Sequence, residues 1–570
     1  MSNKFKLIFL GIIFLVLPLF VRADIIGQTV KFYLDPSYDL TKREETSATL
    51  RLITSQLYFY IDDNWWNTLA LDRQQKINEA LNNLTNEFEG KIYPTLTSYF
   101  GSEWTPGIDN DKKITILIHP MQKDAGGYFN SADEYSKIQS PKSNQREMIY
   151  LNSDYIDKEL SKGLLAHEFL HLITFNQKDK TYGVSEETWL NESRAEAAVT
   201  LLGYDDVYER SNFQIRVKSF LEKPFDSLTD WKNLSSDYGV VNIFTQYLID
   251  QYGIGILTDS LFSDKIGIQS LNSALAKRGF REDFSQIFDN WAISVLINDC
   301  SQGDKYCYKN PNLKNLKVVP QLNFLPLTGE SSLQFTSANY DWSANWYKIV
   351  GGKGKLILEF DGQDEGNFSV IYLICGLQEK CQIQTLPLNE SQTGQIILNG
   401  FLNNNYQSLT IIPIIQTKTS DFDKVQTTYL FTWKVSAVEK TEEEKEAELK
   451  ANLLAQIEFL KKEIAKLQAQ IEVILGIKPQ LSCQGFKDNL YYGLLNDDKV
   501  RCLQQFLKSQ GPEIYPEGTI SGNFLSLTQK ALIRFQEKYK AEILTPLGLE
   551  KGTGFLGEMT RLKVNQLLSY

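Results

Sequence analysis

The chain has 570 residues, too many for one hydrophobic core, so we expect roughly three to five structural units. Its 42% hydrophobic and 23% charged residues are typical of globular domains and exclude a largely disordered chain. The formal net charge is −11 and the basic residues form no long cluster. Nucleic acid is therefore excluded as an expected partner, because phosphate binding requires concentrated Lys and Arg.

Residues 1–23 have the pattern of a secretory signal peptide. Lys4 and Lys6 precede an apolar run at 7–20, and Ala23 stands where a signal peptidase would cut. The run has only fourteen residues, which is short for a membrane span. We therefore expect an exported protein, with an uncleaved membrane anchor as the alternative.

Six cysteines lie in three pairs that are close in sequence. An even number of cysteines behind an export signal favours disulfides, and none has the C-x-x-C spacing of a zinc or redox site. Closeness in sequence is the reason for expecting the bonds Cys300–Cys307, Cys375–Cys381 and Cys483–Cys502.

Residues 24–303 combine strand-like and helix-like segments, which predicts an α+β region. Apolar patterns indicate strands at 57–61, 114–118 and 147–151, and helical spacing indicates a helix within 73–96.

Two acidic residues, Asp109 and Asp111, occupy a polar turn before the strand at 114–118. They are candidates for Ca²⁺, but the ligand set is incomplete, so a turn closed by side-chain hydrogen bonds is favoured. His119 ends the same strand, where a lone histidine is more often structural than a ligand, and we leave it out of the metal site.

The segment 163–175 carries the strongest chemical signal, His167-Glu168-x-x-His171. On a helix, residues four apart project from one face. Two such imidazoles can bind one tetrahedral Zn²⁺, with Glu168 as a candidate general base. The chain has only three histidines, which makes a chance match rare; the alternative is a buried helix whose histidines only form hydrogen bonds.

A second helix is predicted at 189–199, where alanine is frequent. Glu192 follows His171 by twenty-one positions, enough for one helix to end and another to return. Glu192 and Glu196 share a face, so one can bind the metal while the other accepts the N–H of a metal-bound imidazole. A solvated helix face is the alternative for this pair.

Together, His167-Glu168-x-x-His171 and Asn191-Glu192-x-x-Ala195-Glu196 resemble the motifs of the gluzincin metallopeptidases, the group that includes thermolysin. The stretch 59–253 is similar to the hyicolysin-type secreted bacterial peptidases, also through the segments 89–94, 100–104 and 106–111. The resemblance implies a zincin-like fold, zinc ligands His167, His171 and Glu192, and Glu168 as the catalytic base.

Two positions depart from thermolysin-like enzymes, which carry an aspartate in place of Glu196 and a separate histidine that stabilises the transition state. This chain has no further histidine downstream. Other gluzincins use tyrosine, and Tyr238, at the start of a helix predicted at 241–252, is our candidate. A buried core tyrosine is the alternative interpretation.

The expected chemistry follows from charge. A zinc ion held by two neutral imidazoles and one carboxylate keeps a positive charge and an open position for water. We expect that water to become more acidic, and Glu168 to take its proton and later pass it to the leaving amine. Tyr238 is expected to help stabilise the oxyanion.

Three further segments follow the catalytic region. Alternating apolar and polar residues predict an antiparallel β-sandwich at 312–437. Within 438–478, seven Ile and Leu residues recur in steps of four and three, which predicts a coiled coil; a weak dimer and a helix packed on its own chain are the alternatives.

Residues 481–570 resemble the small all-α peptidoglycan-binding domain through 500–507, 518–524, 528–536 and 557–561, with extra residues at 541–554. An unrelated three-helix bundle is the alternative.

The predicted protein is thus an exported zinc endopeptidase attached to a bacterial cell wall by its C-terminal domain. Its expected partners are a protein or peptide substrate and peptidoglycan, with a second copy of the chain through the coiled coil. Two alternatives stay open: a non-enzymatic envelope adhesin or scaffold, and a peptidoglycan peptide hydrolase.

Overall fold

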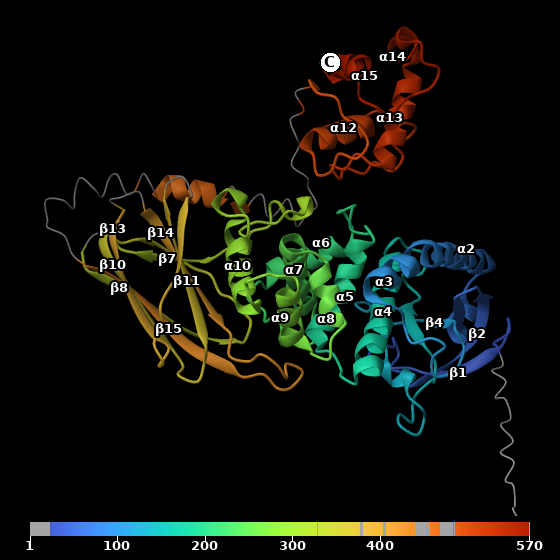
Figure 1. Ribbon diagram of the computed structural model, residues 1–570, viewed down its shortest axis with the longest axis horizontal. Coiled ribbons are helices and arrows are strands. Elements are labelled where there is room, and N and C mark those ends of the chain that lie inside the picture. Colours follow the sequence, from blue (N-terminus) through green and yellow to red (C-terminus); the bar gives the residue numbers. More distant parts are fainter. Residues whose placement is uncertain are drawn as a thin grey trace, which may run out of the picture. The chain divides into compact units, whose positions relative to one another are not determined.

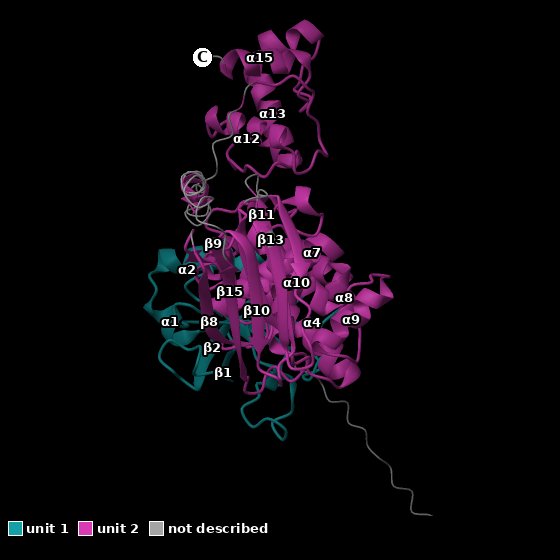
Figure 2. Cartoon of the chain, turned by 90° about the vertical axis from the view of Figure 1, so that its left-hand side faces the viewer, with its two compact units in different colours: residues 1–90, 102–161 teal, residues 91–101, 162–570 magenta. Residues whose placement is uncertain are grey.

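The computed structural model describes residues 23–327, 329–376, 380–402, 406–438, 453, 456–464, 466–467, 483 and 485–568 (Figure 1). The chain is multidomain and mixed α/β, with several sheets and many helices. Two compact units divide it, residues 1–90 with 102–161 and residues 91–101 with 162–570 (Figure 2). The division falls inside the region 24–303 that the sequence suggested as one domain.

Within the described residues, every helix is too short or too polar to span a bilayer. The predicted signal peptide lies outside these residues except for Ala23.

The first unit contains a six-stranded sheet of order β1-β2-β3-β4-β6-β5. Its strands are β1 (Thr29–Tyr33), β2 (Glu45–Ile53), β3 (Leu57–Asp62), β4 (Ile114–His119), β5 (Gly127–Phe129) and β6 (Met148–Asn152). The three strands expected from sequence are therefore confirmed as β3, β4 and β6. These three are parallel neighbours and are buried along their whole length, which explains their continuous apolar runs.

The helical structure expected within 73–96 is confirmed, and it is divided into three consecutive segments. They are α2 (Leu71–Glu87), a π-helical turn (Phe88–Ile92) and α3 (Tyr93–Phe100), which belongs to the second unit, while the short α1 (Asp63–Thr68) precedes them. Pro94 occupies the first turn of α3, where its missing N–H costs no helical hydrogen bond.

The polar turn at Asp109 is closed by hydrogen bonds. Asp109 Oδ1 accepts from the Asp111 N–H at 2.8 Å, and Asp111 accepts from the Tyr58 hydroxyl at 2.7 Å. Both carboxylates thus serve the turn, as the favoured interpretation expected. His119 is fully buried with its Nδ1 3.4 Å from Asp39 Oδ2, which agrees with a structural histidine.

The second unit begins with a helical region that contains the predicted metal motif. After α3 its helices are α4 (Leu160–Phe175), α5 (Thr188–Leu201), α6 (Asn212–Glu222), α7 (Ser235–Tyr252), α8 (Gly255–Leu261), α9 (Gly267–Lys277) and α10 (Phe284–Ile297). Helices α6 and α7 pack in close contact at Gly239, where a Cβ would lie only 2.6 Å from the Phe220 nitrogen. Side chains of both helices bond the same residue of α5, Glu196.

A β-sandwich follows in the same unit. Sheets of order β13-β10-β15-β8 and β12-β11-β14-β9-β7 enclose one apolar core. The strands are β7 (Gln321–Leu325), β8 (Ser331–Tyr340), β9 (Tyr347–Gly351), β10 (Gly354–Gly362), β11 (Phe368–Gly376), β12 (Cys381–Thr385), β13 (Thr393–Phe401), β14 (Tyr406–Ile415) and β15 (Thr428–Val438). The expectation of a purely antiparallel sandwich is wrong at one edge, because β7 and β9 pair in parallel. Alternation of apolar residues does not encode strand direction.

The three predicted disulfides are confirmed, with Cys300–Cys307, Cys375–Cys381 and Cys483–Cys502 bonded. Of the predicted coiled coil, 453, 456–464 and 466–467 are described and helical, and the rest beyond Val438 lies outside the described residues. The apolar seam positions that are described, Leu453, Ile457, Leu460, Ile464 and Leu467, are 39–55% exposed. Glu463 lies 3.2 Å from Lys348 of the sandwich, so this helix contacts its own chain while its seam stays exposed.

The C-terminal segment is all-helical and contains an internal repeat. Its helices are α12 (Asp498–Ser509), α13 (Ser526–Lys538), α14 (Lys540–Ile543) and α15 (Glu558–Leu568). Gln504 of α12 and Gln536 of α13 each accept a hydrogen bond from a glycine N–H and donate to the main-chain carbonyl of the residue after that glycine. Each also donates to the hydroxyl of a threonine in the first turn of a later helix. The partners are Gly522, Asn523 and Thr528 for the first, and Gly554, Phe555 and Thr560 for the second. The extra residues at 541–554 contain most of α14 and a 3-10 turn (Thr545–Leu547).

Candidate metal centre

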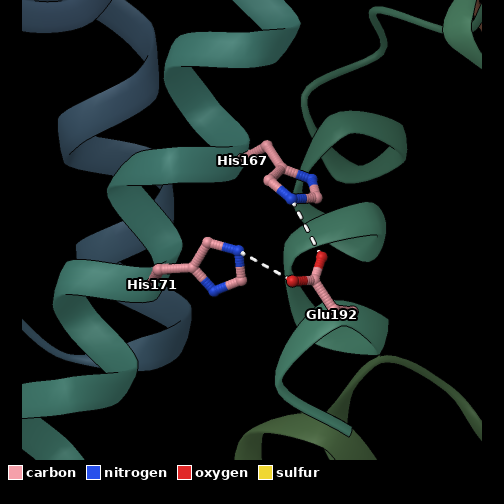
Figure 3. A group of neighbouring side chains, drawn as sticks. All are labelled: His167, His171 and Glu192. Carbon is pink, nitrogen blue, oxygen red and sulfur yellow. Dashed lines mark ion pairs between the residues drawn. The ribbon is translucent and has the colours of Figure 1, made fainter. Parts of the chain in front are cut away.

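Helices α4 and α5 bring the predicted ligands together. His167 and His171 project from successive turns of α4, and Glu192 faces them from α5 (Figure 3). Glu192 Oε2 lies 3.2 Å from His167 Nε2, and its Oε1 lies 3.6 Å from His171 Nε2. One candidate ligand atom from each residue lies within 4.8 Å of the others. Among the described residues, this is the one group of three or more His, Cys, Asp or Glu side chains that could hold a metal ion. Asp109 and Asp111 do not belong to it, so the structure adds no support for Ca²⁺ there.

The donor set fits a transition-metal ion such as zinc. Two imidazole nitrogens and one carboxylate are the ligands of catalytic zinc sites, which keep a fourth position open. His171 Nδ1 lies 3.1 Å from Asn191 Oδ1, and an amide oxygen can only accept a hydrogen bond. The Asn191 oxygen favours a proton on Nδ1 of His171. In that tautomer Nε2, which faces Glu192, is the nitrogen that can bind a metal ion.

Glu196 lies behind His167 in a set of hydrogen-bond donors. Its Oε1 is 3.7 Å from His167 Nδ1 and accepts from Arg216 Nε at 3.1 Å and Nη2 at 2.7 Å. Its Oε2 accepts from Asn242 Nδ2 at 2.8 Å and Asn212 Nδ2 at 3.2 Å. These contacts satisfy a fully buried carboxylate with hydrogen bonds and fix it in position. Glu196 is placed to orient the imidazole of His167 and not to bind the metal itself.

Burial and charge set the proton affinities in the site. Burial lowers the pKa of His167, but the hydrogen bond to Glu192 and the nearby carboxylates outweigh it and raise that pKa to about 9. Burial raises the pKa of Glu168 to about 8, assisted by the charges of Glu192 and Glu196 and opposed by His167. A metal ion must displace the proton from His167, so the affinity for metal is expected to fall as the pH decreases below about 9.

A buried ionic network fixes α5. Arg194 Nη1 lies 2.8 Å from Glu186 Oε2 and its Nη2 donates to Ser260 Oγ at 2.8 Å. Lys178, also fully buried, lies 3.6 Å from the same carboxylate oxygen and donates to the Ser260 carbonyl at 2.8 Å. The helix that carries Glu192 is thereby tied to α8 and to the segment that follows α4.

Tyr238 lies close to the Glu196 donor set. Its ring centroid is 4.3 Å from the Arg216 guanidinium carbon, and its hydroxyl donates to Asn233 Oδ1 at 3.1 Å. Tyr238 is half-buried and is not one of the core tyrosines. Its role in catalysis stays a prediction.

The three converging residues were predicted from the sequence, but most of the residues around them were not. Asn191 adjoins Glu192 and belongs to the quoted motif, so its proximity was a usable signal. Arg216 and Asn242 come from α6 and α7, and nothing in their local sequence marks them as partners of Glu196. Only the packing of these helices against α5 reveals them.

Replacing Arg216 with methionine is expected to weaken zinc binding about tenfold, the lower end of the range for residues that orient a ligand. The change removes two hydrogen bonds from Glu196 and leaves its buried charge uncompensated. Competition with a chromogenic chelator measures the affinity. Lys218→Met removes an exposed charge from the same helix and serves as the control. Equal affinities for the two variants would contradict the assigned function of the Glu196 donor set.

Comparisons with known proteins do not assign the chain to a family. No protein-family model and no curated protein matches the chain. The chain is similar to Aeromonas hydrophila PliG, a periplasmic inhibitor of g-type lysozyme (14% identity, TM-score 0.15, 21% of this chain and 98% of that one). Salmonella Typhimurium PliG gives 12% identity, a TM-score of 0.15 and coverages of 20% and 99%. A family GH115 4-O-methyl-α-glucuronidase gives 8% identity, a TM-score of 0.12 and coverages of 59% and 53%. Likenesses with such TM-scores carry no argument about fold or function.

Proposed function

We propose that the chain is an exported zinc endopeptidase of the gluzincin type, resembling the hyicolysin-type secreted peptidases. One observation carries the proposal: His167, His171 and Glu192 converge within 4.8 Å, and the buried carboxylate of Glu168 adjoins His167 in the chain. Two histidines and a carboxylate leave one position free for water or substrate, which is typical of a catalytic site and not of a structural one.

The residues of the site have separate functions. A bound zinc ion supplies Lewis-acid chemistry, polarising the substrate carbonyl and making water more acidic. Glu168 accepts the proton of the attacking water and transfers it to the leaving amine. Asn191 and Glu196 hold His171 and His167 in the orientation that presents Nε2 to the ion. Burial of these groups keeps bulk water from competing for their hydrogen bonds.

Tyr238 is the proposed donor to the oxyanion. Its replacement by phenylalanine is expected to lower kcat by about 10²-fold, the usual loss for one oxyanion donor, while KM and zinc content stay unchanged. The ring and its contact with Arg216 remain in the variant, so packing is preserved. Initial rates on a fluorogenic peptide give kcat and KM separately. A variant with wild-type kcat would remove Tyr238 from the mechanism.

Peptidoglycan attachment is proposed for the C-terminal helices on the resemblance of 481–570 alone. Export is proposed on the N-terminal signal and agrees with the three disulfides. Cell-wall pull-down of the full chain, with Gln504→Ala and Gln536→Ala variants, tests the attachment. Both glutamines support their loops from within.

The experiment that tests the proposed function is digestion of an unfolded protein such as reduced casein by the purified chain. We expect internal peptide bonds to be cleaved, cleavage to stop after chelation, and zinc to restore it. Purified sacculi incubated in parallel test the peptidoglycan peptide hydrolase alternative. Absence of cleavage of both substrates by zinc-loaded protein would favour the non-enzymatic scaffold.

A further inference from the structure

The β-sandwich contacts the helix that carries Glu192. The connection between β14 and β15 reaches the N-terminus of α5, where the Thr188 N–H lies 3.3 Å from Asp423 Oδ1 and 3.4 Å from Oδ2. Glu187 is the N-cap residue of α5 but forms no capping bond, and its carboxylate accepts from the Trp189 indole instead. The sandwich therefore supplies an acceptor that the helix lacks in its own sequence.

The position of this acceptor matters for the metal site. The first N–H groups of a helix have no partner within it, and a carboxylate placed there stabilises the first turn. Thr188 precedes Glu192 by four residues, so the bonded amide lies one turn before the metal ligand on the same face. Loosening this turn would remove the support directly before Glu192.

The connection that presents Asp423 is held in place by its own contacts. Phe422 is buried beside it, and the fully buried Trp342 donates from its indole to the Lys418 carbonyl at 2.7 Å. The Trp342 ring packs edge-on against Phe284 of α10, with 4.7 Å between ring centroids. Phe422 and the Lys418 carbonyl thus anchor the connection on the N-terminal side of Asp423.

A second junction ties the sandwich to the helices that support Glu196. Between α6 and α7, the Ser227 hydroxyl donates to the Asp341 carbonyl at 2.6 Å and the Leu228 N–H donates to the Trp342 carbonyl at 2.9 Å. These two helices carry Arg216 and Asn242, which bond Glu196. Both carboxylates of the site thus depend on helices that contact the sandwich.

We propose that the β-sandwich contributes to the metal centre. Asp423 of the sandwich is a positioning residue that fixes the N-terminus of α5 and thereby Glu192. The inference rests on the proposed zinc site and not on peptidase activity. A sandwich that only bound substrate or only separated domains would not need this contact with α5.

The test measures zinc affinity of the full chain by chelator competition, together with amide hydrogen exchange in 188–192. Asp423→Ala is expected to weaken zinc binding about fivefold and to speed exchange of the first turn of α5, because the cap acceptor is lost. Asp423→Asn keeps an oxygen acceptor and is expected to restore most of the affinity. Asp421→Asn is the matched control, since that side chain bonds Lys424 in the same connection.

Wild-type affinity and exchange in Asp423→Ala would overturn the inference, as would equal losses in Asp421→Asn. A wild-type chain that binds zinc but cleaves no protein would overturn the proposed function. The zinc affinities of the Asp423 and Asp421 variants would still test the present inference. A wild-type chain that binds no zinc would overturn both.

Discussion

Replacing Glu168 with glutamine is expected to abolish peptide hydrolysis while the protein still binds one equivalent of zinc. Glutamine has the same size and keeps an acceptor oxygen, but it cannot take a proton from water. A general base contributes about 10²- to 10⁴-fold, and we expect kcat/KM to fall by about 10³-fold or more. Glu168 is not one of the three converging ligand residues, so the affinity for metal should hold.

The control for this variant is Glu222→Gln, which removes an exposed carboxylate from α6. Casein cleavage and zinc content measured on the same preparations separate loss of chemistry from loss of metal. A Glu168→Gln variant that retains more than a tenth of the wild-type activity would exclude this residue as the base.

Replacing Glu192 with alanine is expected to release the zinc. Of the three converging residues, the two imidazoles of α4 would remain. We expect the affinity to fall on the order of 10³-fold, beyond the 10- to 100-fold typical of residues that only orient a ligand. Zinc-to-protein ratios after dialysis, determined by mass spectrometry of the metal, measure this loss.

Glu196→Gln distinguishes the two carboxylates of α5. Its carboxylate accepts four hydrogen bonds from α6 and α7 and faces the far nitrogen of His167. We expect this variant to keep zinc during dialysis at a 10- to 100-fold lower affinity. A greater loss in Glu196→Gln than in Glu192→Ala would reverse the assignment of ligand and orienting residue.

The ligands were predictable because helical geometry relates positions to faces. His167 and His171 lie one turn apart on any helix, and the spacing to Glu192 left room for an antiparallel return. Local patterns also located the strands of the first unit and of the sandwich. Each of these features depends on residues close together in the chain.

The rest of the site depends on packing between distant segments. Arg216 and Asn242 reach Glu196 only because α6 and α7 meet at Gly239 and lie beside α5. Asp423 lies in a turn whose sequence resembles any polar connection, yet it contacts α5 more than two hundred residues earlier in the chain. The parallel pairing of β7 with β9 is likewise a tertiary outcome that alternation cannot encode.

The most direct test of the zinc peptidase account is a titration of the chelator-stripped chain with zinc while casein cleavage is followed. The account predicts that activity rises in proportion to zinc and saturates at one equivalent per chain. Zinc uptake without activity, or cleavage that persists in the stripped protein, would contradict it.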